Sequence, residues 1–181
     1  MTEQQFWDII NVSLVQNAPG SDAQYQAIGN SLAQLSPDQL IGFENQLNYQ
    51  KIRAFTFPVL MANFILQSYI NDDIFEDFRL WLISFGQARF NQILEQPDVL
   101  ADFCEIKDPI EEITGEGLVF AALEAYEQKT GQKDFLKHLT RTEEPEIQYD
   151  WPESQQGLAR LMPKLYSRYW DSSRSYELSA D

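Results

Sequence analysis

Four carboxylates and one guanidinium between residues 72 and 79 form the densest group of side chains that could do chemistry. On a helix, the pairs Asp72–Glu76 and Asp73–Asp77 are i,i+4 neighbours, and like charges at that spacing repel. We therefore expect a cation, a metal ion or a basic partner to relieve them. Hard cations bind such oxygens, but the spacing lacks the alternating ligands and the glycine of a calcium loop. The structural alternative is an acidic helix N-terminus stabilised by the helix dipole, with Arg79 pairing inside the cluster.

A second acidic segment follows much later in the chain. It comprises Glu143, Glu144 and Glu146, close to a tryptophan, Trp151, in a stretch rich in loop-forming residues. Loops often carry function, but Trp151 could equally anchor the loop on the helices. The two acidic segments together are the predicted binding surface for a basic protein partner: Asp72, Asp73, Glu76, Asp77, Glu143, Glu144 and Glu146.

A small-molecule site is the competing interpretation of the same region. In it, Asp72, Asp73 and Arg79 converge with Trp81 on a cleft, where the arginine binds a carboxylate or a phosphate. Aromatic residues at helical spacing are more often core residues than pocket walls, which counts against this arrangement.

Other catalytic chemistry lacks the residues it needs. The chain has one histidine, His138, and one cysteine, Cys104, which cannot make a zinc site alone. Acidic neighbours disfavour a reactive thiolate at Cys104, so we expect a buried, inert thiol. No glycine-rich phosphate loop occurs, because Gly115 and Gly117 lack the third glycine and a preceding strand. The sequence thus predicts no catalytic residue, no metal and no cofactor, and favours a protein that is not an enzyme.

The charge balance narrows the choice of partners. Asp and Glu number 28 against 13 Lys and Arg, for a formal net charge of −15. Nucleic acids and anionic membranes are disfavoured, because both need clustered basic residues. Basic proteins are favoured, because the field accelerates their encounter. The longest apolar stretch, residues 55–66, is too short to span a bilayer, and no signal peptide opens the chain. We expect a cytoplasmic protein.

Helices must position these side chains, because apolar residues recur at helical spacing nearly throughout. The chain of 181 residues is about one domain long. We expect an all-α, single-domain, compact bundle of about seven or eight helices over residues 1–171, with a frayed tail at 172–181. Capping signals predict helix starts after Thr2, Ser36 and Asn71. Residues 107–117 are expected to be mainly loop. A long loop within 132–157, ordered by the anchors Tyr149 and Trp151, precedes one C-terminal helix over about 155–170.

One stretch resembles a known family signature. Residues 72–86, DDIFEDFRLWLISFG, are similar to the central motif of the bacterial DUF4240 family. The opening Phe6-Trp7, the segment 97–101, the segment 125–131 and the closing residues 161–165 agree with it, while Phe85 departs from it. The resemblance implies a small α-helical bacterial protein of unknown function and supplies no catalytic residues.

These observations lead to two hypotheses from different classes. The first is a non-catalytic acidic protein-binding module, most specifically an immunity-type inhibitor that occludes a basic toxin or effector; a regulator or scaffold with another partner is its plainer form. The second is a helical enzyme or small-ligand-binding protein that uses the Asp/Arg/Trp cleft around residues 72–81. Catalytic motifs are missing, which favours the first hypothesis.

Overall fold

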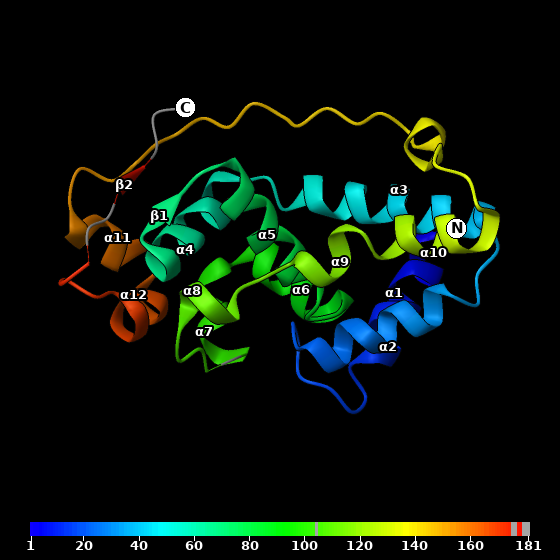
Figure 1. Ribbon diagram of the computed structural model, residues 1–181. Helices are drawn as coiled ribbons and strands as arrows, with labels where there is room; N and C mark the ends of the chain where they lie inside the picture. The colour runs from blue at the N-terminus through cyan, green and yellow to red at the C-terminus, as the bar shows by residue number, and fades with distance from the viewer. Residues whose placement is uncertain (104, 175–176, 179–181) are drawn as a thin grey trace.

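Helices make up nearly all the regular structure of the computed structural model, which describes residues 1–103, 105–174 and 177–178 (Figure 1). The fold is all-α, as the apolar spacing predicts. Cys104, the predicted buried thiol, lies outside the described residues.

Three helices begin at the predicted capping residues. The side chains of Thr2 and Ser36 accept hydrogen bonds from main-chain N–H groups three residues later and complete capping boxes, while Asn71 accepts from Ile74. Such caps satisfy donors that have no partner within the helix. The helices they start are α1 (Glu3–Ser13), α3 (Pro37–Arg53) and α5 (Asp72–Ile83).

The most apolar helix lies between α3 and α5. In α4 (Phe57–Gln67), every residue from 59 to 66 is buried, so this helix is enclosed on most sides. It ends at Ser68, whose φ of 62° is left-handed. The short strand β1 (Tyr69–Ile70) then leads into α5, and α2 (Asp22–Leu32) connects α1 to α3.

The second half of the chain is divided into shorter pieces. The segment 107–117, expected to be mainly loop, contains the single-turn helix α8 and the start of a second one, α9. Asp108 caps α8, and Gly115 precedes α9. The expectation of mainly loop is therefore too simple there. Gly131 ends α10 in the left-handed conformation, which glycine adopts without a steric penalty. The elements are α6 (Gln87–Glu95), η1 (Pro97–Val99), α7 (Leu100–Phe103), α8 (Pro109–Glu112), α9 (Glu116–Val119), α10 (Ala121–Thr130) and η2 (Phe135–His138).

The single C-terminal helix expected over 155–170 is wrong. The chain forms α11 (Gln155–Leu161) and α12 (Pro163–Tyr169), with a break at Met162. Pro163 causes the break, because proline has no N–H to donate and restricts the residue before it. Within the segment expected to be a tail, β2 (Glu177–Leu178) pairs in parallel with β1.

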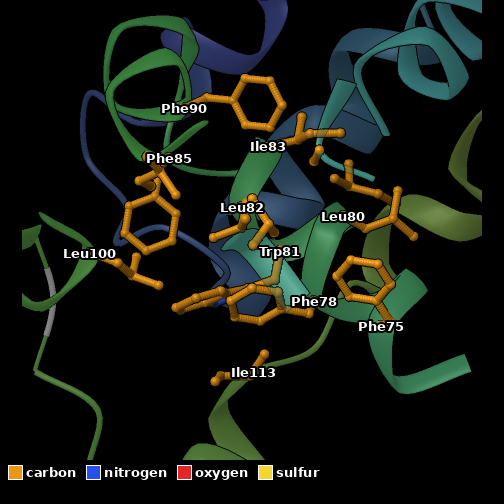
Figure 2. Packing of buried hydrophobic residues seen from close by; sticks show 14 of the residues in the cluster. Phe75, Phe78, Leu80, Trp81, Leu82, Ile83, Phe85, Phe90, Leu100 and Ile113 are labelled. Carbon is orange, nitrogen blue, oxygen red and sulfur yellow. The ribbon is translucent and has the colours of Figure 1, made fainter. Parts of the chain in front are cut away.

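The core forms around α5. Helix α3 packs against α10, α1 and α5, while α4 packs against α12 and α5. Aromatic and aliphatic side chains of α5 and of the elements that follow it are packed together there (Figure 2). Among the labelled residues are Phe78, Trp81, Phe85, Phe90 and Leu100.

An extended segment, residues 139–154, crosses the bundle from η2 at one end to α11 at the other, and we call it the strap (Figure 1). It corresponds to the predicted long ordered loop. Thr140 fastens its start by donating its N–H to the side chain of Asn45 over 2.8 Å. Near its end, Trp151 packs edge-on against Phe57 and Phe64, with ring centroids 5.0 Å apart in both pairs. The interpretation of Trp151 as an anchor fits these contacts.

Candidate functional site

Arg79 lies under the strap and is almost completely buried. Its side chain is 3 % exposed. The guanidinium carbon lies 4.6 Å from the ring centroid of Phe55 and 4.7 Å from that of Phe75. Aromatic faces attract a cation electrostatically, and the attraction is strongest where water is excluded. The ring of Phe55, between α3 and α4, and that of Phe75, on α5, therefore form the aromatic walls of the site that holds the guanidinium.

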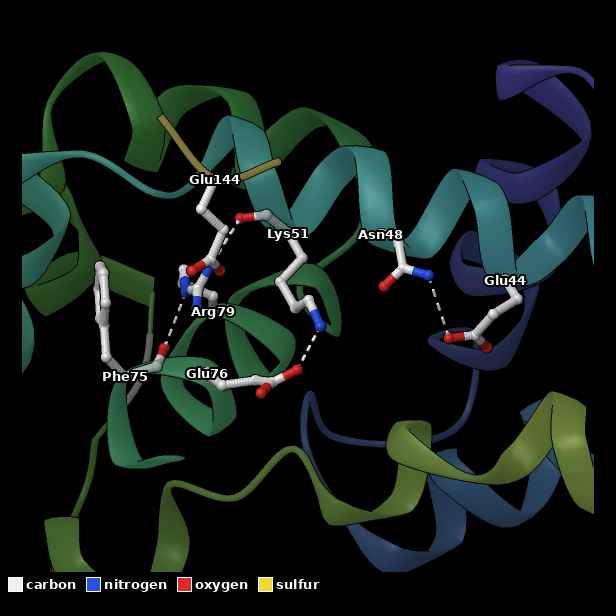
Figure 3. Close-up of polar contacts among 7 residues, drawn as sticks. All are labelled: Glu44, Asn48, Lys51, Phe75, Glu76, Arg79 and Glu144. Carbon is white, nitrogen blue, oxygen red and sulfur yellow. Dashed lines mark hydrogen bonds and ion pairs between the residues drawn. The ribbon is translucent and has the colours of Figure 1, made fainter. Parts of the chain in front are cut away.

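The strap supplies the negative charge that balances this guanidinium. Nη1 of Arg79 donates to Oε1 of Glu144 over 2.8 Å, and Nε donates to the carbonyl oxygen of Phe75 over 3.2 Å (Figure 3). Glu144 itself remains 48 % exposed. The expectation that Arg79 pairs inside the acidic cluster of its own helix is therefore wrong, because its ionic partner comes from 65 residues further along the chain.

A row of polar side chains continues from this pair along α3. Lys51 pairs with Glu76, and one of its neighbours on the same helix, Asn48, donates to Glu44 over 3.4 Å (Figure 3). Burial raises the pKa of Glu44 to about 7, although the positive charge of Lys51 acts in the opposite direction. Lys51 is thus the cation that relieves part of the predicted repulsion on α5.

The four predicted acids of α5 lie along two stripes of the helix. Asp72 and Glu76 share a stripe with Arg79, at i, i+4 and i+7, on the side of α3 and the strap. Asp73 and Asp77 share the other stripe. Asp72 and Asp73 are exposed, while Glu76 and Asp77 are partly buried. The sequence thus indicates one cluster where the structure has two.

Asp77 faces a hollow between α5, α8 and α9. The cavity has a volume of about 380 Å³, and Glu111 and Glu116 line it as well. Burial raises the pKa of Asp77, and the negative charges of Glu116, Glu76 and Asp73 raise it further. Within the described residues, no group of three or more His, Cys, Asp or Glu side chains is arranged to hold a metal ion.

Trp81 lies away from the arginine and belongs to the core. It is 3 % exposed, and its ring lies 4.8 Å from that of Phe85 and 5.8 Å from that of Phe78. Two positions on a helix correspond to roughly 200° of rotation, so Arg79 and Trp81 project on opposite sides. Of the four residues proposed for a small-ligand cleft, the structure brings Asp72 and Arg79 onto one stripe, leaves Asp73 on the other and places Trp81 in the core.

The strap acids have different environments. Glu144 turns in towards Arg79, whereas Glu143 and Glu146 are exposed. Sequence reasoning missed two further exposed acids of the strap, Asp150 and Glu153. Both follow Glu146 within a few residues, so the sequence already indicated that they belong to the same acidic segment.

Of the apolar contacts of the strap, those of Tyr149 and Trp151 were expected as anchors of the ordered loop, and that of Ile147 was missed. Ile147 packs against the core, and Tyr149 lies edge-on to Phe57 at 6.2 Å. Ile147, Tyr149 and Trp151 alternate with polar residues, which is the period of an extended segment resting on an apolar surface. This alternation could have identified the anchors from the sequence.

Comparisons with known proteins return one finding. A family model described as "Protein of unknown function (DUF4240)" matches residues 1–128. No curated protein and no solved structure matches the chain. Among the described helices, none has the length and apolar character required to cross a bilayer.

Proposed function

Because this chain belongs to the DUF4240 family, whose description assigns no activity, we propose a function from its geometry: it is an acidic protein-binding module that recognises a basic partner. The most specific form of the proposal is an immunity-type inhibitor that covers the basic site of a toxin or effector in the cytoplasm of a bacterium.

One observation carries the proposal: the fold neutralises some predicted acids and leaves others available. Glu76 pairs with Lys51, and Glu144 pairs with Arg79. Four other predicted acids are exposed and have no ion pair within the described part of the chain: Asp72, Asp73, Glu143 and Glu146. Asp72 and Asp73 lie in the first turn of α5, where the helix dipole favours a negative charge, and their carboxylates remain open to a partner.

The contact between Arg79 and Glu144 also joins the two acidic segments. It holds the strap against the helix whose first turn carries Asp72 and Asp73, so the acids lie on adjoining elements. A concentrated negative surface raises the rate at which a positively charged partner arrives, and the effect falls as salt screens it. Enzymes that act on nucleic acids expose basic clefts of complementary charge.

Affinity needs anchors as well as charge. Tyr149 is 63 % exposed and lies among the strap acids, held from behind by its edge contact with Phe57. Tyrosine is enriched among residues that dominate binding energy, because it presents a large rigid surface with a polar tip. The strap therefore combines acids that attract a basic partner with an aromatic residue that can be buried by it.

The test is capture of the partner followed by charge removal on the bait. The chain, tagged and expressed in its source cells, is recovered from lysate at low salt, and we expect one stoichiometric basic protein that high salt releases. Expressing that protein alone then shows whether it is toxic and whether the chain restores growth. The double variant Glu143→Gln/Glu146→Gln should weaken capture, whereas Glu95→Gln/Glu124→Gln, which removes two exposed acids elsewhere, should not. Recovery of the chain alone at every salt concentration would overturn the proposal.

A further inference from the structure

The strap has the side-chain pattern of a β-strand but has no partner strand. Between Pro145 and Pro152, the residues alternate in environment. Ile147 and Trp151 pack against the core, and Tyr149 between them contacts Phe57 with its ring edge but stays 63 % exposed. The residues on the other face are all exposed, and they are Glu146, Gln148 and Asp150. Alternation of this kind is what a half-buried strand shows, because successive side chains point to opposite faces.

The main-chain N–H and C=O groups of this segment also lack main-chain partners among the described residues. Among the described residues, none from 140 to 153 takes part in a hydrogen bond between main-chain groups, and Thr140 alone donates its N–H to a side chain. An extended segment with unpaired N–H and C=O groups is a template on which another chain can add a strand. The six residues 146–151 span about 20 Å, the length of an ordinary strand.

We propose that residues 146–151 accept an extended, basic segment of the partner as an added β-strand. This inference rests on the proposed function and names the manner of binding. Main-chain hydrogen bonds supply affinity without depending on sequence, and side chains on the outer face select the partner. Glu146 and Asp150 lie on that face, so lysine or arginine at alternate positions of the incoming segment meets them as cross-strand neighbours.

The body of the protein prepares the segment for this role. The ion pair from Arg79 to Glu144 holds the chain just before Pro145, and the rings of Phe57 and Phe64 hold Trp151 at the other end. Each proline fixes its own φ and removes one donor, which marks a boundary for the paired region. Ordering of the strap before binding reduces the entropy that the partner must overcome.

Two synthetic octapeptides test the inference on the whole protein. One alternates lysine with valine, and the other has the same sequence with alternate main-chain nitrogens methylated. Residue-resolved hydrogen exchange should show protection of alternate amides within 146–151 when the first peptide binds. The methylated peptide should bind about tenfold or more weakly, because it cannot complete the ladder.

Charge is tested with matched variants. Glu146→Lys/Asp150→Lys should weaken binding of the lysine–valine peptide by about tenfold or more, whereas Glu95→Lys/Glu124→Lys, with the same change in net charge, should have a smaller effect. Circular dichroism confirms that each variant is folded.

The outcomes separate this inference from the proposed function. Salt-sensitive binding of both peptides with equal affinity, without alternate amide protection, overturns strand addition and leaves the recognition of a basic partner standing. Failure of both peptides to bind at low salt also overturns strand addition, and the capture experiment still decides the function. A third outcome is that the amides of 146–151 are protected but both double-lysine variants bind the lysine–valine peptide equally well. That result overturns the assignment of Glu146 and Asp150 as the residues that select the partner.

Discussion

The carboxylate of Glu144 lies 2.8 Å from the guanidinium of Arg79, although 65 residues separate them in the chain. The arginine is buried between two aromatic rings, while the glutamate remains half exposed. The contact fastens the strap to the central helix and gives Arg79 an ionic partner.

Removing the charge of Glu144 should destabilise the protein. In Glu144→Gln the side chain keeps its length, but Arg79 becomes a buried cation without a counter-charge. Loss of one partner of a fully buried pair is strongly destabilising, and the exposure of Glu144 reduces the expected cost to about 1–2 kcal/mol. Urea denaturation measures it. Glu143→Gln, an exposed neighbour, should change stability by less than about 0.5 kcal/mol; equal effects of the two variants would show that the pair contributes nothing.

Substitutions of Arg79 distinguish a structural role from a ligand-binding role. Arg79→Ala should lower stability by about 3 kcal/mol, because it leaves a gap between Phe55 and Phe75 and removes the partner of Glu144. Arg79→Met fills the gap and should recover part of that loss. Thermal unfolding ranks the two variants. A fully stable Arg79→Ala protein that loses binding of a small anion would instead support the small-ligand hypothesis.

The stability of the protein should depend on pH through Glu44. Its pKa of about 7 in the folded state lies above the usual value of 4.5, because burial disfavours the charged form. The folded state therefore binds more protons than the unfolded state between those values, and stability falls as pH rises from about 4.5 to about 7. Glu44→Gln, which carries no charge, should exceed the wild type by roughly 3 kcal/mol at pH 8 and match it near pH 4. Denaturation at several pH values tests this, and a constant difference across the range would contradict it.

Two glycine substitutions should have opposite effects. Gly20 has φ of 72°, and a Cβ there would lie 2.5 Å from atoms Cδ1 and Nε1 of Trp81. Gly20→Ala should therefore cost about 2 kcal/mol or more through backbone strain and displacement of the indole. Gly29 lies inside α2, and a Cβ there meets nothing within 4 Å. Gly29→Ala should stabilise by about 0.5–1 kcal/mol, and differential scanning calorimetry compares the two. A Gly20→Ala protein as stable as the wild type would show that the close approach to Trp81 relaxes freely.

Local signals explain why parts of the fold could be predicted. The starts of α1, α3 and α5 depend on a capping side chain and a main-chain N–H three residues away, so a few residues of sequence contain the whole interaction. The break before Pro163 was equally local, but the apolar periodicity on both sides masked it.

Contacts between distant segments explain what could not be predicted. The acids of α5 suggest an internal partner for Arg79, and nothing near them indicates that Glu144 would take that place. The separation of Arg79 and Trp81 follows from helical geometry and was available in the sequence. Which side faces the core and which faces the strap was decided by packing with Gly20 and Phe55.

The position of the strap has a consequence for where this protein can be cut. The family match ends at residue 128, and the strap begins 11 residues later. A fragment that stops at that boundary would retain Arg79 and both rings around it but would lack the carboxylate of Glu144. In this chain, the segment matched by the family model therefore contains a buried arginine but not the carboxylate that pairs with it. A truncation intended to isolate it must carry an acid in from elsewhere or replace the arginine.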